Sequence, residues 1–231
     1  MSTSTRRSPM GSATRVTISL GCATLLLFGC GGGGGVEPIE PAIDFPVAAA
    51  VASYAGSAHQ YDLAGALDGV SFTMRYTYTP DVAGNFEGRA TATAIETLVM
   101  YANGTFATQT ASRRFFTANP YVEYGSVDDD GSYSVFNQTA MLPTTARVTQ
   151  SGVVGSTIDY ADSSKTQITA TGTVGWSLDP DTVTTALLCL NQSFSGTVSG
   201  SGAECYRINA TGQVLGMLIK VDVNGKTLTL K

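Results

Sequence analysis

The sequence predicts an all-β protein: an antiparallel meander of about ten to twelve strands that forms a barrel-like or folded-over sheet, with one short N-terminal helix. After Gly56, apolar and polar residues alternate with a period of two, as in strands that bury one face. Turn-forming residues recur at short intervals, which favours antiparallel neighbours because parallel pairing needs long crossovers. Such a sheet can close into an up-and-down barrel, or fold over into a sandwich or a half-barrel capped by the helix.

The helix is predicted over Val47 to Tyr54, a segment rich in alanine. Asp44 is expected to cap the free amide groups of its first turn, and Pro46 suits an early helical position. Gly56 is expected to end the helix. After this point the helical spacing of apolar residues disappears, so every later element is expected to be a strand.

The clearest strand is predicted between Val70 and Tyr78. Every second residue there is apolar, and the residues between them are serine, threonine or arginine. One face of the strand is therefore expected to be buried and the other to be wet. The residues expected on the buried face are Val70, Phe72, Met74, Tyr76 and Tyr78.

Turn residues separate the predicted strands and pair them locally. Asn103-Gly104 and Asn224-Gly225 each lie between two strand-like runs, which is the strongest short-range signal of a β-hairpin. Three further turns are predicted from clusters of aspartate, glycine, proline and serine. They lie at Asp128 to Gly131, Ala161 to Ser164, and Asp179 to Asp181.

Two cysteines beyond the N-terminal region, Cys189 and Cys205, are predicted to form a disulfide between neighbouring strands of one hairpin. Three glycines, Gly196, Gly200 and Gly202, lie between them. Two unpaired thiols are the alternative. No metal site is expected, because two cysteines and one histidine are too few for a closed set of nitrogen and sulfur ligands.

No catalytic residue is predicted. His59 is the one histidine, and the chain holds no nucleophile elbow of the Gly-x-Ser-x-Gly type to accompany it. Two acidic pairs, Asp159 with Asp162 and Asp179 with Asp181, flank predicted turns, where aspartate is expected for its backbone hydrogen bonds. We therefore expect no enzymatic activity and no cofactor.

Tyrosines in or beside the predicted strands allow two interpretations. They can be ordinary strand formers that bury a ring and leave the hydroxyl wet. They can instead line the mouth of a barrel that holds an apolar or sugar-like ligand. These tyrosines are Tyr76, Tyr78, Tyr101, Tyr121, Tyr124, Tyr133, Tyr160 and Tyr206.

The N-terminal region has the order of a secretion signal. Arg6, Arg7 and Arg15 precede an apolar run from Val16 to Phe28, which is shorter than the roughly 20 residues of a membrane-spanning helix. The run ends in Leu27-Phe28-Gly29-Cys30, which resembles the lipobox of bacterial lipoproteins. The resemblance implies that a signal peptidase cuts before Cys30. It also implies that the Cys30 thiol carries a diacylglyceride and that the mature chain carries palmitate.

An earlier lipobox ending at Cys22 is the alternative, but it leaves only Val16 to Leu20 as an apolar core and places Ser19 where an aliphatic residue is expected. Cys30 is therefore the predicted attachment site. Gly31 to Gly35 and the two prolines that follow predict a flexible tether. This arrangement resembles lipoproteins of Gram-negative bacteria. Because no aspartate follows Cys30, the resemblance implies the outer membrane.

The predicted organisation is a signal peptide over residues 1–29, a lipidated tether over 30–43 and one β-rich domain over 44–231. The net charge of the chain is −5, and removal of the signal peptide makes it more negative, which argues against a nucleic-acid partner. We expect an envelope lipoprotein that binds a hydrophobic small molecule or a partner protein. The alternative is a structural or surface-displayed domain without a ligand.

Overall fold

A computed structural model describes residues 43–231 except 198 and 224. The predicted signal peptide and nearly all of the predicted tether therefore lie outside the described residues. The described part contains one helix and twelve strands. The elements are α1 (Val47–Ala55), β1 (His59–Leu67), β2 (Val70–Phe86), β3 (Arg89–Ala102), β4 (Thr105–Ala118), β5 (Tyr121–Asp128), β6 (Tyr133–Gln138), β7 (Ser151–Tyr160), β8 (Ile168–Pro180), β9 (Thr185–Gly196), β10 (Gly200–Asn209), β11 (Val214–Val223) and β12 (Lys226–Leu230).

The strands form a single antiparallel sheet in which each strand pairs with its neighbours in the sequence, from β1 to β12. The predicted all-β meander is therefore confirmed. The two edges approach each other, because Ala64 in β1 and Lys231 after β12 exchange two backbone hydrogen bonds of 3.0 Å. Gly65 permits this approach, since a Cβ there would lie 2.2 Å from the carbonyl oxygen of Thr229. The sheet is therefore barrel-like and nearly closed.

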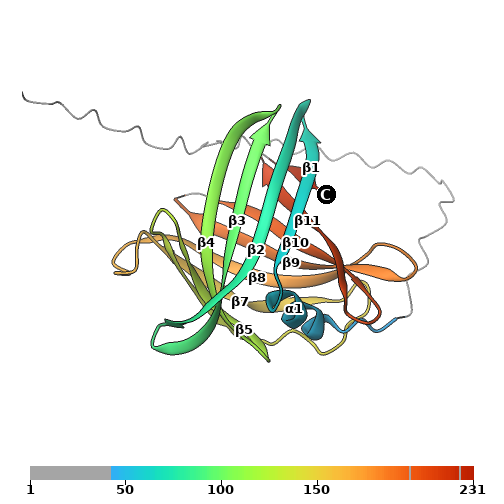
Figure 1. Cartoon of the computed structure of the whole chain (residues 1–231), viewed down its shortest axis with the longest axis horizontal. Helices are drawn as coiled ribbons and strands as arrows, with labels where there is room; N and C mark the ends of the chain where they lie inside the picture. Colours follow the sequence, from blue (N-terminus) through green and yellow to red (C-terminus); the bar gives the residue numbers. More distant parts are fainter. Residues whose placement is uncertain (1–42, 198, 224) are drawn as a thin grey trace, which may run out of the picture. The chain divides into compact units, whose positions relative to one another are not determined.

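Because neighbouring strands run in opposite directions, successive connections lie at alternate ends of the sheet. The six connections that follow odd-numbered strands lie at one end, which we call the turn end. It includes the predicted Asn103-Gly104 turn, where φ is 49° and 77°, as a two-residue hairpin turn requires. The opposite end, the helix end, holds α1 and the long connection between β6 and β7. Figure 1 shows β1 to β4 rising past α1 toward the turn end.

Helix α1 packs against one face of the sheet, which we call the inner face. Its buried residues Val47, Val51 and Tyr54 belong to the same hydrophobic core as Leu178 and Leu188 from β8 and β9. Burial of these apolar side chains stabilises the helix end at about 25 cal/mol per Å² of apolar surface removed from water. The helix end of the barrel is thus filled by protein, and any interior space lies toward the turn end.

The predicted extent of the helix is confirmed, but the predicted cap is wrong. Gly56 lies directly after the last helical residue, whereas no side chain caps the first turn. The carboxylate of Asp44 instead accepts a hydrogen bond of 2.7 Å from Nε of Arg147. Arg147 is nearby because Phe45 and Ala146 form a β-bridge with each other. A long-range ion pair therefore takes the carboxylate that local spacing assigned to the helix.

Strand β2 confirms the predicted alternation from Val70 to Tyr78 and then continues to Phe86. A bulge between Asp81 and Gly84 adds one residue relative to β3, which reverses the direction of later side chains. Phe86 consequently lies on the outer face, where it stacks on Phe115 at 4.7 Å between ring centroids. A second, smaller apolar cluster therefore covers part of the outer face.

Candidate functional site

The predicted cysteine pair is confirmed, whereas Cys30 lies outside the described residues. Cys189 and Cys205 are direct register partners in β9 and β10, with their Sγ atoms 2.05 Å apart. They are buried on the outer face beside the half-buried Leu187 and Leu218. Closing a loop of about 15 residues is worth about 3 kcal/mol in the chain-entropy model. Such a bond is typical of a protein that folds in an oxidising compartment.

His59 and the four predicted turn acids have structural contacts. The His59 ring stacks on Tyr54 with centroids 4.0 Å apart, and its Nε2 lies 3.0 Å from the Tyr54 carbonyl oxygen. Each acid has a neighbour that donates a hydrogen bond to it or forms an ion pair with it. These partners are Ser134 Oγ for Asp159 (2.5 Å), Ser164 N for Asp162 (2.8 Å), Lys220 Nζ for Asp179 (3.4 Å) and Arg207 Nε for Asp181 (2.8 Å).

Four charged side chains meet on the inner face, and we call them the interior ion cluster: Glu96, Arg114, Glu123 and Glu204. Their places follow from the register. Glu96 pairs with the inner-facing Tyr78, and Arg114, Glu123 and Glu204 occupy inner positions of β4, β5 and β10. The cluster therefore joins strands that are far apart in the meander.

Arg114 lies at the centre of this cluster. Its Nη1 is 2.9 Å from Glu96 Oε2, and its Nη2 donates hydrogen bonds of 2.9 and 2.8 Å to the two carboxylate oxygens of Glu123. Glu204 is more distant, with Oε2 3.7 Å from Arg114 Nη1. The Arg114 side chain is only 13% exposed, so these pairs are screened far less than surface pairs. One guanidinium thus holds the walls of the barrel together across its interior.

Glu204 has a perturbed acid–base equilibrium. Burial, together with the nearby charge of Glu96, raises the pKa of Glu204 to about 7. The neighbouring Arg114 guanidinium and the Tyr206 hydroxyl oppose this rise without cancelling it. Near neutral pH, Glu204 is therefore divided between its neutral and charged forms.

This equilibrium predicts a pH dependence of stability. Because the folded pKa of about 7 exceeds the ordinary value of 4.5, the folded protein binds more protons than the unfolded chain between these pH values. The resulting stability is complete below pH 4.5 and is lost as the pH rises through 7. Denaturant titrations from pH 5 to 8 should show a slope of up to about 1.4 kcal/mol per pH unit from this group.

Replacement of Glu204 by glutamine should remove this part of the slope, because glutamine does not titrate. The groups that face Glu204 are Glu96, Arg114, Glu123 and Tyr206, and all of them remain in the variant. Asp62→Asn is the matched control, since Asp62 is an exposed acid. Identical pH profiles for wild-type protein and Glu204→Gln would contradict the assignment.

A layer of tyrosines surrounds the interior ion cluster. The hydroxyl of Tyr206 donates a hydrogen bond of 2.9 Å to Glu204, and that of Tyr78 donates one of 3.3 Å to the Ala55 carbonyl oxygen. The buried hydroxyls of Tyr54 and Tyr76 lie beside each other: burial raises the pKa of Tyr54, and a side-chain hydrogen bond with Tyr76 opposes that rise. Neither hydroxyl meets strict hydrogen-bond geometry with any other group among the described residues.

Apolar side chains line the inner face between this layer and the turn end. They lie on β1, β2, β3 and β9, and they are only partly buried although they pack against the main core. A side chain that points into a barrel and remains accessible to solvent indicates that this part of the interior is not filled. These residues are Leu67, Phe72, Leu98, Met100 and Leu190.

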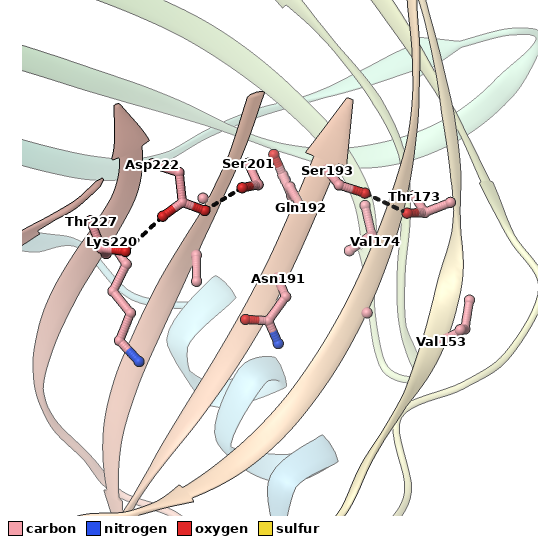
Figure 2. A pocket seen from close by; sticks show the side chains of 13 residues that line it. Val153, Thr173, Val174, Asn191, Gln192, Ser193, Ser201, Lys220, Asp222 and Thr227 are labelled. Atoms are coloured by element: carbon pink, nitrogen blue, oxygen red, sulfur yellow. Dashed lines mark hydrogen bonds between the residues drawn. The ribbon is translucent and has the colours of Figure 1, made fainter. Parts of the chain in front are cut away.

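A hollow of about 510 Å³ lies on the outer face over β7 to β12. Figure 2 shows that hydroxyl, amide and carboxylate groups line it, with Asp222 bonded to Ser201 and Thr227, and Ser193 bonded to Thr173. Because these groups already satisfy one another, the hollow offers few free polar groups to a ligand. The inner face, with its ion cluster and its partly exposed apolar wall, is the better candidate site.

No family model, curated protein or solved structure matches the chain. Within residues 43–231, leaving aside 198 and 224, the protein has no helix of the length and apolar character needed to cross a membrane.

The interior ion cluster was not predicted from the sequence. A signal was present, because Glu96 interrupts the apolar alternation Ala94, Leu98, Met100, and Arg114 shares a strand face with Phe116. A charged residue on an otherwise apolar face predicts a buried partner. Its identity depends on which strands face each other across the barrel, and local spacing does not contain that information.

Proposed function

We propose that the chain is a lipoprotein of a Gram-negative envelope, anchored at Cys30 to the outer membrane, whose barrel binds a small hydrophobic ligand without catalysis. The Leu27-Phe28-Gly29-Cys30 motif and the glycine tether support the anchor. The Cys189–Cys205 pair supports folding outside the cytoplasm.

One observation supports ligand binding most directly: the inward-pointing apolar side chains between the tyrosine layer and the turn end are only partly buried. A fully packed core would bury them, as it buries Leu178 and Leu188 near the helix end. The remaining apolar surface suits a ligand that enters from the turn end. Small barrels commonly hold one such molecule.

Native mass spectrometry of the mature chain tests this function. Residues 30–231 carrying Cys30→Ser would be exported behind a non-lipidating signal peptide and purified without detergent. We expect a species heavier than the chain that loses the extra mass on denaturation. A bare chain mass would argue against a tightly held ligand and favour a structural or surface-displayed domain.

Two substitutions on adjacent residues of β3 locate the binding surface. Met100 is partly buried on the inner face, whereas its neighbour Tyr101 is 39% exposed on the outer face. Met100→Trp should fill the interior and remove the heavier species, while Tyr101→Trp should retain it. Loss of the extra mass from both variants, or from neither, would contradict binding inside the barrel.

A further inference from the structure

The sheet is split between β5 and β6 at the helix end. The two strands are in register only over residues 125–127 of β5 and 133–135 of β6. Residues 121–123 of β5 pair with β4 alone, and residues 136–138 of β6 pair with β7 alone. Two strand edges therefore face each other across the split without being paired to each other. An open strand edge is a template on which another chain can add.

Backbone groups of both strands point into this split. The Glu123 amide donates a hydrogen bond of 3.2 Å to Oε1 of Gln138, so Glu123 directs its backbone toward β6. The Asp128 amide donates one of 3.0 Å to the carbonyl oxygen of Ser132, just before β6. Because the backbone groups of every second residue in a strand point to the same side, Phe136 and Gln138 direct theirs toward β5. The Gln138 side chain, rather than a strand, thus reaches across the split.

A groove of about 520 Å³ lies over the split, and we call it the β5–β6 groove. Its walls are residues 122–124 of β5 and 135–138 of β6, and the tip of the β2–β3 hairpin contributes Phe86, Glu87 and Arg89. Ligand sites in proteins commonly enclose about 300–1,000 Å³. The groove therefore offers room for a ligand together with backbone groups that no strand in the described part of the chain pairs.

The carboxylates of the β5–β6 groove already have cationic partners. Glu87 Oε2 lies 2.6 Å from Nζ of Lys165, and Glu123 Oε2 lies 2.8 Å from Nη2 of Arg114. Like charges brought together at an interface weaken binding, and a paired carboxylate has much of its charge compensated. The two acids therefore repel an acidic ligand far less than two free carboxylates would.

Arg89 is the cation of the β5–β6 groove that lacks such a partner. Its guanidinium carbon lies 5.1 Å from the centroid of the Tyr124 ring, a cation–π contact that holds the charge at the groove. Within residues 43–231, leaving aside 198 and 224, no carboxylate forms an ion pair with it. A guanidinium binds a carboxylate through two parallel hydrogen bonds, which adds both specificity and energy. The charge of the groove therefore favours an acidic ligand.

We propose that the β5–β6 groove binds an extended, acidic segment of a partner protein. The segment adds its backbone between β5 and β6, and one of its carboxylates pairs with Arg89. The Gln138 side chain leaves the split, and a carbonyl oxygen of the segment takes its place at the Glu123 amide. The inference goes beyond the proposed function, because it does not depend on a ligand inside the barrel.

Selection from random octapeptides displayed on phage tests the inference. The target is the exported mature chain with Cys30→Ser, and the Arg89→Gln variant of the same chain is the comparison. We expect the enriched peptides to contain aspartate or glutamate and to bind the target at least about tenfold more tightly than the variant at pH 7.5. Enrichment that is equal on both proteins or absent, or enriched peptides without an acidic residue, would overturn the inference.

Two control variants locate the bound peptide. Arg75 is an exposed arginine outside the groove, where it pairs with Asp62 at 2.7 Å, so Arg75→Gln should leave peptide binding unchanged. Met100→Trp alters the barrel interior and should leave it unchanged as well. A loss in either variant as large as that in Arg89→Gln would contradict docking in the β5–β6 groove.

The addition of a strand is tested on the peptide rather than on the protein. The tightest selected peptide is synthesised again with a methyl group on each backbone amide, which removes its backbone donors and keeps its side chains and charge. We expect this peptide to bind at least about tenfold more weakly, because a strand adds through backbone hydrogen bonds. Equal affinity would show that side chains alone account for binding, and would overturn the proposed strand addition.

The Gln138 side chain provides a test of where the strand adds. Gln138→Ala should bind the unmodified peptide as tightly as the wild-type protein or more tightly, because no side chain then competes for the Glu123 amide. Weaker binding by this variant would contradict insertion of the segment into the split.

Discussion

Replacement of Arg114 by methionine should destabilise the protein by about 3–5 kcal/mol, the usual cost of removing one partner of a buried ion pair. Methionine fills a similar volume but leaves Glu96, Glu123 and Glu204 without their shared cation. The three carboxylates would then repel one another inside the barrel. The free energy of unfolding from urea denaturation at pH 7.5 measures the loss.

The adjacent residue provides the control. Arg113 lies on the outer face, pairs with Asp81 at 2.9 Å and is 41% exposed. Arg113→Met should cost less than about 1 kcal/mol, because exposed pairs contribute little. Similar losses of unfolding free energy in the two variants would show that the ion pairs of Arg114 contribute no more to stability than an exposed pair does.

Replacement of Gly125 by alanine should cost about 3 kcal/mol or more. A Cβ there would lie 2.0 Å from the carbonyl oxygen of Ser134 and 2.6 Å from Cζ of Phe86. The residue also has a φ of 150°, which side chains rarely adopt. Overpacking and backbone strain each contribute about 1–3 kcal/mol. The melting temperature and the free energy of unfolding should both fall.

Gly216 offers a matched substitution in the same sheet. A Cβ at Gly216 would meet no atom within 4 Å. Gly216→Ala should therefore leave stability unchanged or raise it by a few tenths of a kcal/mol, because alanine lowers the conformational entropy of the unfolded chain. Equal free energies of unfolding for Gly125→Ala and Gly216→Ala would contradict the close packing of Phe86 over β5.

Much of the fold could be predicted from local patterns. Alternation over Val70 to Tyr78 identifies the buried face of β2 correctly, because side chains of a strand alternate whatever its neighbours are. The Asn103-Gly104 turn and the Cys189–Cys205 pair are also local, since each joins adjacent strands. The meander follows from such pairings in succession.

Features that depend on distant partners could not be predicted in this way. Spacing assigns Asp44 to the helix, but Arg147, which lies about 100 residues later, binds it. Alternation would also place Phe86 on the inner face, and one extra residue in the bulge after Asp81 reverses it. The interior ion cluster has the same origin, because closure of the sheet brings β10 to β4.

The choice between a barrel and a sandwich also required the structure. Both arrangements give the same period-two pattern, and the deciding contact is the pair of backbone hydrogen bonds between Ala64 and Lys231. The inner face that results combines a filled helix end with a partly exposed apolar wall. Of the tyrosines that the sequence left open as strand formers or ligand-lining residues, Tyr76, Tyr78 and Tyr206 are buried in the main core.

We propose that lipidated Cys30 tethers this barrel to a membrane. Intact-mass and N-terminal peptide mass spectrometry of the full chain, produced in a Gram-negative host and extracted from its envelope, tests this anchor. We expect a mature chain that begins at Cys30 and carries a thioether-linked diacylglycerol with an amide-linked fatty acid. A chain that retains residues 1–29, or one that begins elsewhere with an unmodified thiol at Cys30, would contradict it.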